Sequence, residues 1–216
     1  MQEKQTAKKA GLYIVIEGVD LAGKSTIAKK LVDRLSCTML AFNHEVYHAK
    51  EPSNENYGKL MRETLFSKPE LDEADEIKAA QLMLLDRLEN TSNVCSKLRE
   101  GAIVIQERNF LTALAYNEAG DTDEVKYVQE CNRVTLKPDK LFFIDVNQNT
   151  IENRLKIREK ETKLDAYEDL TLITRRRASY LKLSEYIDQM FINNDNGDDD
   201  RIVDEMFNII NNLLGE

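Results

Sequence analysis

The stretch YIVIEGVDLAGKSTIAKKLVDRL, residues 13–35, decides the fold. It begins with the apolar run YIVIE, which predicts a buried strand, and it ends with apolar residues at helical spacing, namely Ile27, Leu31 and Leu35. Between them, GVDLAGKS at 18–25 matches the pattern G-x-x-x-x-G-K-[ST] of a phosphate-binding loop. Because a strand precedes this pattern and a helix follows it, as the motif requires, it predicts a site for a nucleoside triphosphate.

The residues inside this loop suit a chain of phosphates. Gly18 and Gly23 permit a tight backbone path, so that the N–H groups of the loop can converge on phosphate oxygens. Lys24 would place a cation on the β- and γ-phosphates, and the Ser25 hydroxyl can ligate Mg²⁺. Asp20 would be awkward beside phosphates unless a Mg²⁺ ion or a hydroxyl group is near it; the alternative is a solvated loop aspartate.

Apolar runs and amphipathic segments alternate along the rest of the chain. After the first strand and helix we expect strands within 38–50 and at 102–106, 141–146 and 190–194, and helices at about 56–67, 72–99, 108–119, 123–135, 148–160, 165–187 and 199–214. Continuously apolar strands separated by helices indicate a parallel sheet that is covered on both faces. The sequence therefore predicts one α/β domain over 1–216 with a three-layer P-loop NTPase fold and a mostly parallel, five-stranded sheet.

Composition narrows the class of protein. The chain has 216 residues and a formal net charge of −9, which argues against a surface for binding a nucleic-acid polymer. No apolar run approaches the length of a membrane span, and the opening MQEKQTAKKA lacks the apolar core of a signal peptide. Three widely spaced cysteines favour a reduced, cytoplasmic protein. The run NNDNGDDD at 193–200 is expected to be a polar surface loop.

Polar residues follow the predicted strand at 102–106. Arg108 follows the strand at 102–106, where open α/β sheets bind their ligands, and Thr112 and Tyr116 follow at steps of four. We expect these three side chains to share one helical face that suits an anionic substrate with a flat or sugar part. The alternative is an ordinary amphipathic helix with an exposed arginine.

Other candidate segments are weaker when taken alone. EPS, which begins at Glu51, is an acid–proline turn, while Met83 and Arg87 lie four residues apart on one predicted helix. Met83 alone would ordinarily be a core residue. A basic segment at 152–169 carries Arg154, Arg158, Lys160 and Lys163. It could close over a transferring phosphate as a lid at about 152–168, or it could be a solvated charged helix.

Taken in this order, the segments resemble the thymidylate kinase family of P-loop nucleoside monophosphate kinases. The resemblance rests on IEGVDLAGKST, EPS, ERNFLTALAY and LFFIDVNQNTIENRLKIREKETKLDAYE, and it runs from about Tyr13 to the C-terminus. It implies transfer of the γ-phosphate of ATP, with Mg²⁺, onto dTMP. It also implies nucleotides as the partners and a homodimer, for which the apolar helix at 72–99 could pair with its copy.

The resemblance also assigns roles to individual residues. Gly18, Gly23, Lys24, Ser25 and Thr26 would bind ATP, with Ser25 and Asp20 near the metal. Arg108 would grip the acceptor phosphate beside Glu107, and Tyr116 would pack on the deoxyribose. Thr112, Glu51, Met83 and Arg87 would complete the acceptor site. Lys24, Asp20, Arg108 and the lid cation Arg158, with Arg154 less surely, would stabilise the charge that develops during transfer.

Several positions depart from the family pattern. Met83 stands where an aromatic residue commonly stacks on thymine, and Ala113 replaces a side chain that is polar in many members. Asn109 stands where the family usually has an aromatic residue or histidine, Leu21 where one subgroup has a catalytic arginine, and Ala166 where the lid usually has arginine. We therefore expect phosphoryl transfer with relaxed selectivity for the base, and with Arg158 supplying the missing cation.

Two other functions remain open from the sequence. A deoxynucleoside kinase shares the loop and the Glu–Arg pair, but it needs a base for a neutral 5′-hydroxyl, and Glu51 could be that base. A nucleotide-binding switch protein would need a metal-binding aspartate at a strand end. Asp145 fits that position, but no base-reading motif follows it.

Overall fold

A computed structural model describes residues 11–39, 44–66, 68, 71–116, 136–162, 164 and 167–215. Its five strands are β1 (Leu12–Gly18), β2 (Val46–Lys50), β3 (Ile103–Glu107), β4 (Lys140–Asp145) and β5 (Met190–Asn193). They form one sheet in the order β2-β3-β1-β4-β5, and every neighbouring pair is parallel. The predicted parallel, five-stranded sheet is confirmed, and its central strand is the one that leads into the phosphate loop.

The helices begin and end where the side chains allow it. They are α1 (Lys24–Met39), α2 (Asn56–Met61), α3 (Glu73–Glu100), α4 (Phe110–Tyr116), α6 (Gln148–Glu161), α7 (Leu170–Ser184) and α8 (Asp199–Leu214). Four of these helices have an Asp or Asn residue at their start whose side chain accepts a hydrogen bond from the backbone N–H three residues later. These capping residues are Asp72, Asn147, Asp169 and Asp198. Over the residues that the structure describes, no helix combines the length and the apolar character needed to cross a membrane.

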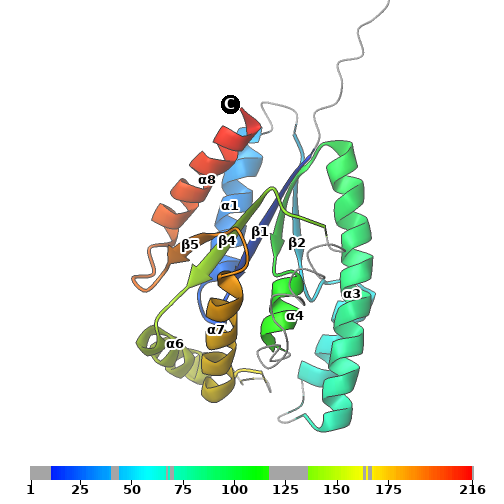
Figure 1. The fold of residues 1–216 in the computed structure, drawn as a ribbon, viewed down its shortest axis with the longest axis vertical. Coiled ribbons are helices and arrows are strands. Elements are labelled where there is room, and N and C mark those ends of the chain that lie inside the picture. The colour runs from blue at the N-terminus through cyan, green and yellow to red at the C-terminus, as the bar shows by residue number, and fades with distance from the viewer. Residues whose placement is uncertain are drawn as a thin grey trace, which may run out of the picture.

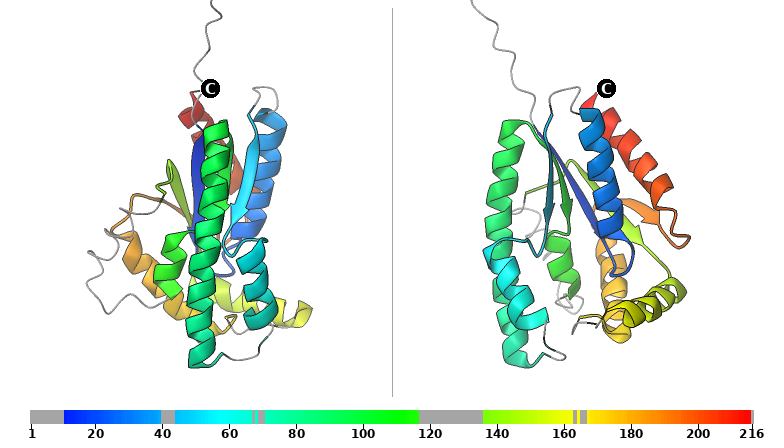
Figure 2. Two further views of the ribbon diagram at one scale, coloured as in Figure 1. Left: turned by 90° about the vertical axis from the view of Figure 1, so that its right-hand side faces the viewer. Right: turned by 180° about the vertical axis from the view of Figure 1, so that it is seen from behind.

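The helices cover both faces of the sheet (Figures 1 and 2). On one face, α1 and α8 pack against apolar residues of β1 such as Ile14 and Ile16. On the other face lie α3, α4 and α7, which cover Tyr13 and Val15 of the same strand. Alternate residues of β1 thus enter two separate apolar cores, as a central strand with continuous apolar character requires.

Some boundaries differ from those expected. The segment expected as a helix at 56–67 divides into α2 and a π-helical turn, η2 (Arg62–Phe66), and the helix expected at 165–187 begins only at Leu170. The loop expected at 193–200 is not wholly exposed, because Asn194 is buried and hydrogen-bonds to the phosphate loop. The helix expected at 123–135 lies outside the described residues.

The carboxyl ends of the strands place the candidate site residues together. Glu17 and Gly18 end β1, Glu107 ends β3, and Glu51 directly follows β2. Since parallel strands end at the same edge of a sheet, these residues meet beside the N-terminus of α1.

Candidate active site

The phosphate loop runs from the end of β1 to the start of α1. Gly23 has a φ of 93°, and a Cβ added there would lie 2.8 Å from the Asn194 Nδ2 atom, so a side chain would be both strained and crowded. Lys24 is buried, and its Nζ atom donates to the Val19 carbonyl oxygen of the same loop at 2.6 Å. Burial, together with the nearby Arg108 guanidinium, lowers the pKa of the Lys24 ammonium to about 8.

Ser25 and Thr26, in the first turn of α1, are exposed. The Ser25 hydroxyl donates to Glu107 Oε2 at 2.5 Å, and His48 Nε2 lies 2.9 Å from Glu107 Oε1. Burial works to raise the pKa of the Glu107 carboxyl, but the hydrogen bonds with His48 and Ser25 outweigh it and lower this pKa. An ionised Glu107 can therefore accept the hydrogen bond from the Ser25 hydroxyl while a lone pair of the serine oxygen stays free to bind a metal ion.

These oxygen atoms fit a magnesium ion, which prefers hydroxyl, carboxylate, phosphate and water oxygens. Within the described ranges, no group of three or more His, Cys, Asp and Glu side chains is arranged to hold a metal. Most of the ligands of a Mg²⁺ ion beside Ser25 would therefore have to be nucleotide phosphates and water. This arrangement is the usual one when Mg²⁺ is bound together with a nucleotide.

Asp20 contacts a cluster of cations and a phenol on the other side of the loop. Its carboxylate accepts from Arg108 NH2 and from the Tyr116 hydroxyl, and Arg176 NH1 lies 3.7 Å away. Burial alone would raise the pKa of Asp20, but Arg108 and Lys24 hold it well below its usual range. Asp20 and Ser25, the two expected metal ligands, thus have different partners, and the metal role of Asp20 stays a prediction.

Arg108 is not part of a helix, contrary to the expectation that it shares a helical face with Thr112 and Tyr116. Its N–H donates to the Ile16 carbonyl oxygen of β1, and its φ of 66° lies in the left-handed region. That conformation costs a non-glycine residue roughly 1–2 kcal/mol. The three side chains nevertheless converge, since Arg108 NH1 lies 3.5 Å from Thr112 Oγ1 and its guanidinium lies 5.4 Å from the Tyr116 ring centre.

Glu51 and Arg87 form a buried ion pair next to this cluster. Arg87 Nε donates to Glu51 Oε2 at 2.8 Å, and Gln106 Nε2 donates to Glu51 Oε1 at 3.1 Å. Burial raises the pKa of the Glu51 carboxyl even though Arg87 opposes it. Both carboxylate oxygens are engaged, so Glu51 is poorly placed to remove a proton from a substrate hydroxyl.

Aromatic rings lie along the other side of Arg108. Tyr167 lies between Tyr116 and Phe66, at ring-centre distances of 6.4 and 5.3 Å, and the Arg176 guanidinium stacks 3.9 Å from the centre of the Tyr116 ring. Met83 packs at the edge of an apolar cluster that also includes Phe66. Phe66, Tyr167 and Arg176 are not among the residues predicted from sequence, and the only local signal for Arg176 is the basic run at 175–177.

The two expected lid cations have different surroundings. Arg158 pairs with Glu168, and its side chain is half exposed. Arg154 reaches the phosphate loop, where it donates to the Leu21 carbonyl oxygen at 2.8 Å, and it also donates to the carbonyl oxygen of Asn194, directly after β5, at 2.6 Å. Arg154 is therefore the α6 cation in direct contact with the loop, a position that the sequence argument ranked second.

The fold and the loop define the class of protein. A central parallel strand leads through a glycine-bracketed loop into a helix, and an arginine-rich cluster faces that loop from the ends of neighbouring elements. This is the arrangement of a P-loop kinase, in which one site binds the donor phosphates and the facing cations bind the acceptor.

Comparisons with known proteins identify the family. The family model for thymidylate kinase matches residues 16–206. The chain is similar to the probable thymidylate kinase of Thermococcus kodakarensis, with 32% identity over 95% of this chain and 100% of that protein. It is also similar to that of Methanocaldococcus jannaschii, with 27% identity over 94% of this chain and 97% of that protein. Among solved structures, it is similar to the thymidylate kinase of Ehrlichia chaffeensis, with a TM-score of 0.67, 21% identity, and 93% and 98% of the two chains covered.

The chain belongs to the thymidylate kinase family. It is a nucleoside monophosphate kinase, and the reaction of the family is the phosphorylation of dTMP to dTDP. Both the predicted fold and the predicted family are thus confirmed.

Proposed function

We propose that this enzyme transfers the γ-phosphate of ATP to dTMP with Mg²⁺, and that its acceptor site also takes dUMP with comparable efficiency. An oxygen of the acceptor phosphate forms the new bond to the γ-phosphorus, and the bond from that phosphorus to the β–γ bridging oxygen breaks, releasing ADP. The observation that carries the proposal is the position of Arg108. Its guanidinium faces the phosphate loop and is held between Asp20 and the Tyr116 ring.

Each half of the site has a separate task in this proposal. On the donor side, Lys24 and the loop N–H groups would bind the β- and γ-phosphates, and Thr26 would contact the same nucleotide. A bound Mg²⁺ ion would neutralise charge on the β- and γ-phosphate oxygens, with Ser25 as a ligand and Glu107 behind it. On the acceptor side, Arg108 grips the monophosphate and Tyr116 packs on the deoxyribose.

The acceptor phosphate is already ionised, so the reaction needs charge neutralisation and alignment more than it needs a base. This requirement agrees with the state of Glu51, whose two oxygens are occupied by Arg87 and Gln106. The alternative of a deoxynucleoside kinase, which would use Glu51 as a base, therefore lacks both a free carboxylate and a family match.

The residues expected around the base depart from the family pattern, which favours a pocket that does not select thymine alone. Met83 is flexible and polarizable, so it can pack against a base without demanding one shape, and Ala113 offers no hydrogen bond to a base edge. One missing methyl group changes selectivity by only about 10- to 200-fold, whereas an unpaired buried polar group rejects a wrong substrate far more strongly.

A panel of dTMP, dUMP, dGMP, dCMP and UMP as acceptors tests the proposal, with kcat/KM as the measurement. We expect dTMP and dUMP to be used within about 200-fold of each other, and dUMP to be preferred to UMP. A preference for dTMP over dUMP of about a thousandfold or more would contradict the relaxed pocket, because one methyl group cannot supply it. Phosphorylation of thymidine in place of dTMP would contradict the acceptor class itself.

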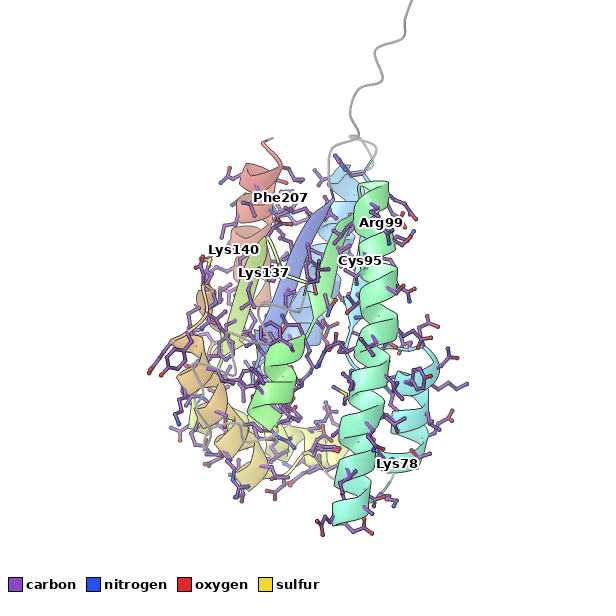
Figure 3. All side chains as sticks on the ribbon, turned by 45° about the vertical axis from the view of Figure 1, so that its right-hand side comes forward. Lys78, Cys95, Arg99, Lys137, Lys140 and Phe207 are labelled. Atoms are coloured by element: carbon purple, nitrogen blue, oxygen red, sulfur yellow. The ribbon has the colours of Figure 1, made fainter. Side chains whose placement is uncertain are left out.

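We also propose that the enzyme forms a homodimer through α3. Large apolar side chains are exposed along that helix at Ile77, Leu84, Leu85 and Leu88, with exposed fractions of 55, 55, 40 and 61%. Residues 77, 84 and 88 fall on one stripe of the helix. Figure 3 shows α3 along its length, with Lys78 and Arg99 near its opposite ends. A second copy, packed about a two-fold axis, would bury the stripe against itself.

Analytical ultracentrifugation tests the dimer. The double variant Leu84→Glu, Leu88→Glu should sediment as a monomer at concentrations where the unmodified protein is a dimer. Leu213→Glu on α8 is the matched control, since Leu213 is 46% exposed and lies on the opposite face of the sheet. A monomeric unmodified protein, or equal dissociation by the control, would rule out this surface.

The free thiols of Cys37 and Cys95 support a reducing, cytoplasmic setting for the enzyme.

A further inference from the structure

The Glu17 side chain occupies a buried position between the two phosphate sites. It is 0% exposed and directly precedes Gly18, the first residue of the phosphate loop. Its Oε1 atom accepts from the backbone N–H groups of Asn109 at 2.7 Å and Thr112 at 3.2 Å. Its Oε2 atom accepts from the hydroxyl groups of Thr112 at 2.9 Å and Tyr180 at 3.1 Å. One carboxylate thus joins the ends of β1 and β3 to α4 and α7.

All of these partners are neutral. Across the part of the chain that the structure describes, every hydrogen bond that Glu17 accepts comes from a backbone N–H or a hydroxyl group. A buried carboxylate is stable only where donors or opposite charges surround it; Glu17 has donors at both oxygens, and the Lys24 and Arg108 cations are near enough to interact with its charge.

That task is visible in the backbone of Arg108. The Arg108 N–H donates to the Ile16 carbonyl oxygen at 2.9 Å, and its carbonyl oxygen accepts from Gln106 Nε2 at 2.8 Å. The next N–H, that of Asn109, is the one that Glu17 accepts. The peptide groups on both sides of Arg108 are therefore fixed, and its left-handed conformation is of the kind that persists only where the surroundings over-determine it.

We propose that Glu17 is a positioning residue for the acceptor phosphate, acting through Arg108. It is bonded covalently to the phosphate loop and by hydrogen bonds to the segment 109–112 that follows Arg108, so it fixes the distance between the two. The inference rests on the proposed function, in which Arg108 grips the monophosphate. Glutamine keeps the shape of Glu17 but removes its charge. Where its NH₂ group takes the place of Oε2, the Thr112 and Tyr180 hydroxyl groups must turn from donors into acceptors, so we expect the exchange to loosen the network.

A double-mutant cycle separates this role from a general effect on stability. Glu17→Gln should raise the KM for dTMP about tenfold or more in the unmodified enzyme and by less than about twofold in the Arg108→Ala background, while the Kd for ATP is unchanged in both. Calorimetric titration with ATP and with dTMP gives the affinities independently of turnover.

The matched control is Asp145→Asn, the same exchange at the end of β4. Asp145 is also a buried carboxylate, but its partner is Arg177 rather than the segment 109–112. It should lower the melting temperature without a tenfold change in the KM for dTMP. Equal effects of Glu17→Gln in the two Arg108 backgrounds, or a similar effect of the control, would overturn the inference and leave the proposed function intact. An unchanged KM for dTMP in Arg108→Ala alone would instead overturn the role of Arg108.

If Glu17→Gln does not fold, as judged by circular dichroism, Tyr180→Phe replaces it in the same cycle. This variant removes one donor to Glu17 and keeps the aromatic ring that packs on Phe143. A smaller rise in the KM for dTMP, about threefold, is expected only when Arg108 is present. The same rise in the absence of Arg108 would overturn the inference.

Discussion

The donor side and the acceptor side of the site hold their charged groups in different ways. On the donor side, the Lys24 ammonium is bound to a backbone carbonyl of its own loop, so this contact lies within a few residues of sequence. On the acceptor side, Asp20 contacts Arg108 and Tyr116, which belong to one segment, and Arg176 of α7, so its partners come from two segments that are distant in sequence. The first arrangement depends on a local motif, whereas the second depends on the folded sheet.

The difference has an energetic consequence. A single bond from Lys24 to a carbonyl oxygen can be exchanged for bonds to phosphate without disturbing other residues. The acceptor cations, by contrast, are already neutralised in part by Asp20, so an incoming monophosphate must compete with that carboxylate for Arg108. Variants on the two sides should therefore affect different kinetic constants.

The largest effect is expected on the donor side, at Lys24. Lys24→Ala should lower kcat by about a hundredfold or more, because it removes a fixed cation from the transferring phosphate, while the affinity for dTMP is kept. Lys29→Ala, which removes an exposed lysine of α1, is the control and should have no such effect. Turnover above about a tenth of that of the unmodified enzyme, equivalent to ~1.4 kcal/mol of barrier, would remove Lys24 from this role.

Arg108→Ala should produce the opposite pattern. It should raise the KM for dTMP about 10- to 100-fold, the range for a lost hydrogen bond between charged groups, and spare the affinity for ATP. Arg177→Ala removes an arginine that pairs with Asp145 instead and serves as the control. Loss of ATP binding with dTMP unaffected would reverse the assignment of the two sides.

The two arginines of α6 should also affect different kinetic constants. Arg154→Ala should raise the KM for ATP about tenfold, because Arg154 contacts the phosphate loop. Arg158→Ala should lower kcat and change the KM values for ATP and dTMP less, if Arg158 leaves Glu168 and supplies the missing cation during transfer. Steady-state kinetics of the two variants decide between them, and an unchanged kcat in Arg158→Ala would move that role to Arg154 or Lys160.

The smallest effect near neutral pH is a pH dependence confined to the donor side. Lys24 has a pKa of about 8 in the free enzyme, so it is charged below that pH and loses its proton above it. Bound phosphates would favour the charged form, and ATP affinity should therefore fall by up to about tenfold per pH unit above pH 8, with uptake of a proton on binding. Calorimetry in buffers of different ionisation enthalpy measures that uptake. Lys24→Arg should abolish it, and dTMP binding should not show it.

The donor side could be predicted from sequence because its determinants are local. The glycines, Lys24 and Ser25 follow one another in a recognisable pattern, and the strand before them is continuously apolar. Arg108 illustrates the limit, since its spacing from Thr112 fits a helix, whereas a hydrogen bond to Ile16 holds it in a left-handed conformation. No local pattern reports a bond to a neighbouring strand.

Long-range partners explain the other omissions. Arg176 meets Asp20 only because α7 packs beside α4, and Tyr167 reaches Tyr116 from the end of the predicted lid. Glu17 did leave a signal, because a carboxylate ends the otherwise apolar run YIVIE, and burial on a central strand would require several donors around it. The roles of these site residues stay predictions until the variants above are measured.

The orientation of α1 has a practical consequence for single-molecule work. Lys24 begins this helix and the exposed Cys37 lies in its last turns, so the rise of an α-helix separates them by roughly 20 Å. Because the nucleotide-binding edge of the sheet is at the first end, a fluorophore or a surface tether attached at Cys37 would leave that edge open to solvent. The helix that begins at the phosphate loop thus also offers an anchoring point from which substrate entry and product release could be watched.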